Sequence, residues 1–265
     1  MSSDKKEFSY VFIHGFESTG DGNKPKKFRE TLINFKAESK CHVYLNSPTL
    51  WEKEEEFEST NFATMFAKVS KAVQDAALHG DNVILMGSSF GGLLVTRFMQ
   101  TRQPGSELVA ACCILSPALH FTDVLTDPAT GSNFFKRMVV GNRDSSEEAH
   151  PKFMAEWEEK GSIRVEYLKF LKWRDVDFKW ASFDDFRSHV KCIDGAGLGV
   201  PTYVLHSKTD EIIPYKYTDD WVNGLPEADR KMVTYNLIPK GDHTLWDVED
   251  LEDMVIEWIR STFSK

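Results

Sequence analysis

The sequence predicts an α/β fold, a mostly parallel, doubly wound sheet of about six strands with helices on both faces. Two observations support this prediction. Apolar runs of strand length alternate with amphipathic helical patterns, and all but one of their connections have the length of a usual crossover. The length of 265 residues, 41% of them hydrophobic and 28% charged, suits a single globular domain over residues 1–265.

The individual elements follow from the spacing of the apolar residues. Apolar runs predict strands at residues 8–13, 41–45, 82–86, 108–115, 201–206 and 232–238. Pro25 can open the first helix, because proline suits the first turn. Further helices are predicted from Asn61 to Leu78 and, at the end of the chain, around an apolar face of Val248, Leu251, Val255, Trp258 and Ile259.

The third of these strands runs directly into a Gly-x-Ser-x-Gly sequence at residues 87–91. This arrangement predicts a nucleophile elbow, a sharp strand-to-helix turn that holds a serine hydroxyl clear of the backbone. The turn is strained, so the positions two before and two after the serine must be small. Gly87 and Gly91 meet this requirement around Ser89, whereas a turn centred on Ser88 would put methionine and phenylalanine there. We therefore expect Ser89 to be the nucleophile.

Candidate partners for this serine follow later strands. Asp210 lies in the loop after the strand at 201–206, and His243 lies in the loop after the strand at 232–238. Serine, acid and histidine in this chain order form one of the known arrangements of a catalytic triad. Asp210 is therefore the expected acid and His243 the expected base.

Other residues compete for the same roles. Glu211 and Asp242 are adjacent alternatives for the acid, but the first candidate follows its strand at the first turn of the loop. Among the eight histidines, His14 and His206 belong to strand-end sequences. We expect structural roles for these two.

With the elbow around Ser89 and its ordered partners Asp210 and His243, the chain resembles the α/β-hydrolase superfamily, and the resemblance covers nearly the whole chain. Within the superfamily the chain is most similar to small intracellular serine esterases and thioesterases, such as the YqiA-like esterases and the depalmitoylase-like hydrolases. The resemblance rests on His14-Gly15, Gly87-Ser-Ser-Phe-Gly-Gly92, His206-Ser-Lys-Thr-Asp210 and Gly241-Asp-His243.

The resemblance implies an order of strands and a pair of oxyanion donors. It places the strands in the order second, first, third, fourth, fifth, sixth, which brings the loop after the first strand opposite the elbow. In such enzymes the residue after the nucleophile donates its backbone N–H to the oxyanion, and here that residue is Phe90. The second donor is expected to be the N–H of Phe16, with Gly15 allowing the loop to approach closely.

One connection is far longer than a usual crossover: residues 116–199 lie between two strands that are expected to be neighbours. The resemblance implies that this insertion is a cap over the active site. Within it, residues 161–168 alternate like a strand, and Ser182 is expected to begin a helix. Its aromatic residues are Phe121, Phe134, Phe135, Phe153, Trp157, Tyr167, Phe170, Trp173, Phe178, Trp180, Phe183 and Phe186.

Charge and cysteine content restrict the partners. The formal net charge of −9 argues against a nucleic acid. Cys112 and Cys113 are adjacent in an apolar strand, while Cys41 and Cys192 are isolated, as expected for reduced thiols. No spacing fits a metal site, and no apolar run fits a signal peptide or a membrane span. We expect a cytoplasmic protein that needs neither metal nor organic cofactor.

These features predict a serine hydrolase that cleaves carboxylic esters or acyl thioesters through a triad and an acyl-enzyme. The expected partner is a small acyl ester or thioester, or an acylated protein, and the expected state is a monomer or homodimer. Two rival functions stay open. One is another reaction on the same fold, by a lyase, perhydrolase or C–C hydrolase. The other is a ligand receptor that keeps the triad but turns over slowly.

Overall fold

The structure is a computed structural model that describes residues 8–16, 18–39, 43–139, 146–166, 175–191, 193 and 195–264. The expectations for Cys41, Cys192, Tyr167, Phe170 and Trp173 therefore lie outside the described residues, as does the start of the second predicted strand. None of the helices in the described ranges has the length and hydropathy needed to cross a membrane.

The main sheet has six strands, all parallel, in the order β2-β1-β3-β4-β7-β8. This is the predicted order, so the fold-class prediction is confirmed. The strands are β1 (Phe8–Ile13), β2 (Val43–Asn46), β3 (Asn82–Ser88), β4 (Val109–Leu115), β7 (Thr202–Ser207) and β8 (Val233–Ile238). Because β1 lies between β2 and β3, the connections of β1 leave on opposite sides, and the loop after β1 faces the loop after β3.

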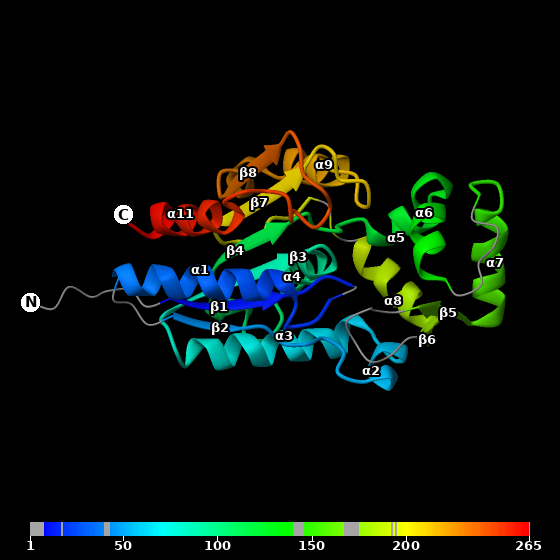
Figure 1. Ribbon diagram of the computed structural model, residues 1–265, viewed down its shortest axis with the longest axis horizontal. Coiled ribbons are helices and arrows are strands. Elements are labelled where there is room, and N and C mark those ends of the chain that lie inside the picture. Colours follow the sequence, from blue (N-terminus) through cyan, green and yellow to red (C-terminus); the bar gives the residue numbers. More distant parts are fainter. Residues whose placement is uncertain are drawn as a thin grey trace, which may run out of the picture.

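Helices cover both faces of this sheet (Figure 1). One face packs against α1 (Asn23–Ser39) and α11 (Leu251–Phe263), and the other against α3 (Phe62–Ala77), α4 (Phe90–Gln100) and α9 (Lys216–Gly224). Neighbouring strand residues enter opposite cores, as strand geometry requires. Cys112 and Cys113 illustrate this, since both are fully buried but belong to different clusters. Short helices complete the fold: α2 (Glu54–Glu58), the 3-10 turn Ser106–Leu108 and α10 (Glu227–Arg230).

The insertion between β4 and β7 forms a compact layer of its own elements. It contains α5 (Phe121–Thr126), α6 (Pro128–Met138), α7 (His150–Lys160), β5 (Ser162–Glu166), β6 (Asp175–Lys179) and α8 (Trp180–Val190). Strands β5 and β6 pair antiparallel in a separate sheet. The expected start of α8 at Ser182 is wrong. The helix follows β6 directly, Lys179 is its extended N-cap residue, and Ser182 is buried in the first turn.

The aromatic core of the insertion is continuous with the core of the sheet layer. Phe16, in the loop after β1, lies 5.3 Å from Phe121 and 5.6 Å from Phe178, measured between ring centroids. The ring centroid of Phe90, at the start of α4, lies 5.2 Å from that of Phe186. The insertion occupies the end of the molecule remote from the start of β1 and the end of α11 (Figure 1). It therefore lies beyond one end of the sheet and is fused to the main core.

Candidate active site

The candidate nucleophile stands on a strained turn between β3 and α4. Ser89 has φ 56° and ψ −122°, a backbone conformation that residues other than glycine rarely adopt. Gly87 makes this turn possible, because a Cβ there would lie 2.4 Å from the carbonyl oxygen of Gly91. The close approach of these two positions is the one expected from the sequence of the elbow.

Gly91 has a further role that its spacing does not reveal. A Cβ at Gly91 would lie 2.1 Å from the carbonyl oxygen of Ile13, at the end of β1. Gly15 also faces the elbow, since a Cβ there would lie 3.2 Å from Ser89 Cβ. The glycines therefore let the loop after β1 pack directly against the candidate nucleophile.

Three side chains from different loops form a continuous hydrogen-bonded chain. Ser89 Oγ lies 2.8 Å from His243 Nε2, and His243 Nδ1 lies 2.7 Å from Asp210 Oδ2. A carboxylate only accepts hydrogen bonds, so His243 Nδ1 carries the proton and Nε2 accepts from the serine hydroxyl. This is the geometry needed for the imidazole to remove the serine proton.

Asp210 is held as a buried carboxylate. Its Oδ1 accepts backbone N–H bonds from Ile212 at 2.9 Å and Ile213 at 2.8 Å. Burial by itself would raise the pKa of this carboxyl, but the hydrogen bonds from His206 and His243 outweigh it and hold the pKa well below its usual value. Asp210 is therefore ionised whenever His243 can act as a base.

The two alternative acids lie elsewhere. The carboxylate of Asp242 accepts from the hydroxyl of Thr244 at 2.7 Å and from the backbone N–H of Trp246 at 3.2 Å. Glu211 is an exposed residue at the wall of the cavity above the site. Among the three acids considered, Asp210 is the one that the structure joins to His243.

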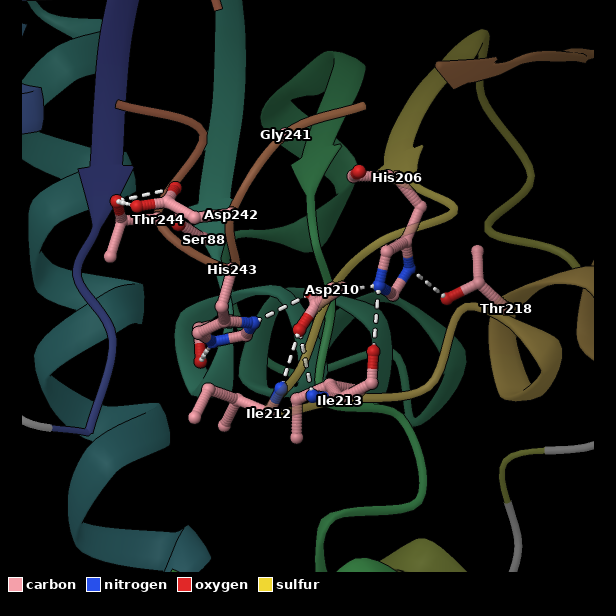
Figure 2. Close-up of polar contacts among 12 residues, drawn as sticks. Ser88, His206, Asp210, Ile212, Ile213, Thr218, Gly241, Asp242, His243 and Thr244 are labelled. Atoms are coloured by element: carbon pink, nitrogen blue, oxygen red, sulfur yellow. Dashed lines mark hydrogen bonds and ion pairs between the residues drawn. The ribbon is translucent and has the colours of Figure 1, made fainter. Parts of the chain in front are cut away.

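His206 belongs to the site although the sequence predicts only a structural role for it. Its Nε2–H lies 3.0 Å from Asp210 Oδ2 and 3.1 Å from the carbonyl oxygen of Ile213, while Nδ1 accepts from Thr218 Oγ1 at 2.9 Å. Figure 2 shows Asp210 between the rings of His206 and His243. The side chains of both His206 and Asp210 are fully buried. The one signal in the sequence is the four-residue spacing between His206 and Asp210 at the end of a strand.

We expect His206 to orient Asp210, so His206→Leu should lower kcat about 10- to 100-fold, the worth of one hydrogen bond to a charged group. KM should change little, because the residue does not reach the cavity. His206→Gln can still donate to Asp210 and should recover most of the loss. Thr218→Val, which removes only the donor to the far nitrogen, serves as the milder control. Equal losses in the Leu and Gln variants would show that the ring matters only for packing.

His14 organises the loop after β1. Its Nδ1–H donates to the carbonyl oxygen of Gly15 at 2.7 Å, and its Nε2 accepts from the backbone N–H of Leu50 at 2.9 Å. Burial lowers the pKa of His14 to about 4, so the ring is neutral, as this pair of bonds requires. In a trans peptide the carbonyl and the following N–H point in opposite directions. Holding the Gly15 carbonyl thus fixes the direction of the Phe16 N–H, the expected oxyanion donor.

A cavity of about 720 Å³ lies over these groups and includes both Ser89 and His243 in its wall. One part of the wall is apolar and comes from Phe16, Phe121, Phe134, Ile212 and Ile213. Another part is polar and comes from the loop after β1 and the start of α1, with Ser18, Thr19, Asn23 and Lys24. A groove of about 530 Å³ along α3 contains none of these residues. Because Phe121 belongs to α5 and Phe134 to α6, the insertion forms part of the wall of the larger cavity.

The parallel six-stranded sheet with its flanking helices has the α/β-hydrolase fold. More narrowly, the chain belongs to the family described as serine aminopeptidase, S33 (Hydrolase_4), whose profile matches residues 53–249. That span includes Ser89, Asp210 and His243, while the loop after β1 lies before it.

Several solved structures share the fold. Est1E from Butyrivibrio proteoclasticus is 17% identical, with a TM-score of 0.66 over 98% of this chain and 90% of that chain. Mouse alpha/beta hydrolase domain-containing protein 10 is 16% identical, with a TM-score of 0.58 over 96% and 90%. The esterase domain of a Rhodothermus marinus protein is 15% identical, with a TM-score of 0.56 over 97% and 89%. No curated protein matches the sequence significantly.

Proposed function

We propose that this hydrolase cleaves carboxylic esters or acyl thioesters through a covalent acyl-enzyme on Ser89. The observation that carries the proposal is the chain of hydrogen bonds from Ser89 through His243 to Asp210, in the wall of a cavity with an apolar side. A serine hydroxyl that donates to a neutral imidazole, backed by a buried carboxylate, is the arrangement that activates serine for acyl transfer.

The proposed reaction has two halves. In the first, His243 Nε2 takes the proton of Ser89 while the serine oxygen bonds to the substrate carbonyl carbon. The tetrahedral intermediate then collapses, the bond to the alcohol or thiol breaks, and His243 returns the proton to that leaving group. In the second half, His243 deprotonates a water that attacks the acyl-enzyme, which releases the acid and restores the serine hydroxyl.

The oxyanion is proposed to accept from two backbone N–H groups. Phe90 is the first residue of α4, and first-turn amides have no partner within the helix. The Phe16 N–H is fixed by the bond that His14 makes to the preceding carbonyl. Each such donor is typically worth about 3 kcal/mol in the transition state. The helix dipole places a partial positive charge at the N-terminus of α4, which adds to the stabilisation of the oxyanion.

We also infer that the insertion is a cap that receives the acyl chain. Phe121 and Phe134 reach the cavity from α5 and α6, and both rings contact Phe16 in the loop after β1. An acyl chain against these rings would leave water, which contributes about 0.8 kcal/mol for each methylene group buried. Behind this wall Phe135 packs against Phe134, and Phe153 and Trp157 pack against Phe135.

Covalent labelling tests the nucleophile. A fluorophosphonate probe should add one label to the wild-type protein, none to Ser89→Ala and one to Ser88→Ala. The neighbouring serine is a matched control, since it differs from Ser89 by one position and lies outside the hydrogen-bonded chain to His243. A label that persists in Ser89→Ala would overturn the assignment.

Turnover separates the esterase from its rivals. Sustained release of p-nitrophenol from a butanoyl ester supports the proposal, whereas one stoichiometric burst followed by near silence supports a receptor. The matching p-nitroanilide measures amide cleavage, and we expect it to react much more slowly. A faster reaction with the anilide would indicate a peptidase instead.

A further inference from the structure

Lys24 lies in the same cavity as the candidate nucleophile. It is the second residue of α1, and its Nζ donates to Ser88 Oγ at 2.6 Å. Ser88 immediately precedes Ser89, so the ammonium group stands beside the elbow. Nothing in the proposed hydrolysis uses this amine, and no motif in the sequence points to it.

The ammonium group has no carboxylate partner among the described residues at ion-pair distance. Of its three donors, one is used by the neutral hydroxyl of Ser88. Asp242, Asp210 and Glu252 act on it from farther away, from the loops after β8 and β7 and from α11. Two N–H donors are therefore available to a ligand. An unpaired cation withdrawn from water is costly, so its retention in a cavity wall points to a ligand of opposite charge.

The amine nevertheless keeps its charge at neutral pH. Burial lowers the pKa of Lys24 to about 8, and the more distant carboxylates limit that fall. The acidic residues of the cavity wall, Asp21 and Glu211, are exposed, and solvent screens their charge. An anion placed against Lys24 is therefore attracted by a partly buried cation that it contacts directly. Asp242, Asp210 and Glu252 repel it from farther away, and the two exposed residues of the wall repel it only weakly.

The apolar and polar parts of the cavity wall suit different parts of a substrate. An acyl chain suits the wall of Phe121 and Phe134, and an anion does not, because burial against aromatic rings would strip its hydration. The polar wall, with Lys24 and Asn23, remains for the group on the other side of the reacting carbonyl. That group is the alcohol or thiol that leaves.

We propose that Lys24 binds an anionic group on the leaving group, so the preferred substrates are esters or thioesters of an alcohol or thiol that carries a carboxylate or phosphate. This inference rests on the proposed esterase function and adds the substrate class. The carbonyl is then held between the apolar wall and a charge-assisted hydrogen bond, which fixes its position over Ser89.

A matched pair of esters tests the preference on the wild-type protein. One is the butanoyl ester of 5-hydroxy-2-nitrobenzoate, and the other carries a carboxamide in place of the carboxylate. Both release a nitrophenol and have nearly the same shape. We expect kcat/KM to be about 10- to 100-fold higher for the carboxylate, the range of a hydrogen bond to a charged group. A third ester with a phosphonate at that position distinguishes the two anions, and a preference for either supports the proposal.

Variants then assign the preference to Lys24. In Lys24→Met the ratio of kcat/KM between the carboxylate and carboxamide esters should fall to near one, and in Lys24→Arg it should be largely kept. Ser88→Ala removes the hydroxyl but leaves the ammonium group, so its ratio should stay high. Lys216→Met removes one exposed positive charge that is not part of the cavity wall and controls for net charge. A ratio that falls as far in Ser88→Ala as in Lys24→Met would show that the amine only supports the elbow.

The outcomes separate this inference from the proposed function. If Ser89 is labelled and both esters react equally in the wild type, the hydrolase is an esterase and the anion site is wrong. If neither ester reacts and Ser89 is not labelled, the proposed function itself is wrong. If Lys24→Met does not fold, the wild-type ratio of kcat/KM between the carboxylate and carboxamide esters can be measured at rising NaCl concentration to test the proposal. Screening should reduce a ratio that depends on charge, and an unchanged ratio would overturn the proposal.

Discussion

Substituting Ser89 and His243 by alanine together is expected to lower kcat for a butanoyl ester by roughly 10⁴- to 10⁶-fold, no more than either substitution alone. The reason is that the two residues act as one unit in the proposed mechanism. Without the imidazole the hydroxyl is a weak nucleophile, and without the hydroxyl the imidazole has no proton to transfer. Single and double variants should be compared in a complete cycle. Losses that multiply would indicate independent roles and contradict the proposed unit.

The same measurement identifies the acid. Asp210→Asn should cost about 10⁴-fold in kcat, because an amide at this position favours the wrong tautomer of His243. Glu211→Gln and Asp242→Asn change the same group at adjacent or nearby positions, and we expect near wild-type rates for both. Retained activity in Asp210→Asn with a large loss in Glu211→Gln would mean that the acid is wrongly assigned. Circular dichroism and thermal melts should accompany each variant, since buried Asp210 also binds the Ile212 and Ile213 amides.

Shortening the apolar wall is the change with the next largest expected effect. Phe134 is half-buried and lines the cavity, so Phe134→Ala should lower kcat/KM for an octanoyl ester roughly 10- to 100-fold and for an acetyl ester only slightly. The long chain loses the ring that shields several methylene groups, whereas the acetyl group does not reach it. The ratio between the two esters is the quantity to measure.

Phe153→Ala is a matched control for this experiment. Phe153 is also a partly buried aromatic of the insertion and lies 4.9 Å from Phe135, but it is not part of the cavity wall. Its loss should reduce thermal stability without changing the ratio between octanoyl and acetyl esters. A uniform loss across both esters in Phe134→Ala would show that the insertion is structural cover and does not select the acyl chain.

Point substitutions are needed because the insertion is not separable from the rest of the protein. Replacing it by a short linker would expose Phe16, Phe57 and Phe90, which pack against Phe121, Phe178 and Phe186. Buried aromatic rings each contribute several kcal/mol when removed from water. We therefore expect the shortened protein to unfold rather than to show an altered chain-length preference.

The sequence by itself determined the strands of the sheet and the positions of the expected triad, while the order of the strands came from the resemblance to the α/β hydrolases. Strand and helix periods are local, so the apolar runs of β1, β3 and β7 are visible in the sequence. A parallel α/β sheet places the ends of its strands at one edge, and this rule brings loops that are distant in the chain together. For that reason the sequence predicts that Ser89, Asp210 and His243 lie close together, and hydrogen bonds join the three side chains in the structure.

Only the tertiary structure revealed the groups that support those residues. Lys24 has no distinctive local pattern, and the sequence from His206 to Asp210 does not show what His206 binds. The roles of both residues come from hydrogen bonds to Ser88 and Asp210. Gly91 looks like a spacer of the elbow in the sequence, but its own close contact is with the carbonyl of Ile13 on another strand. The contact partners of a side chain depend on distances between elements, and those distances are set by packing after the local pattern has chosen helix or strand.

The insertion shows the same division. Its position and its excess of aromatic residues are plain in the sequence, as is the strand that became β5. Its attachment is not, because an aromatic residue that packs within the insertion and one that packs across to Phe16 have the same local pattern. The sequence therefore determined which segment could supply an aromatic wall for the cavity. Packing of Phe121 and Phe134 against the loop after β1 decided that the wall faces Ser89.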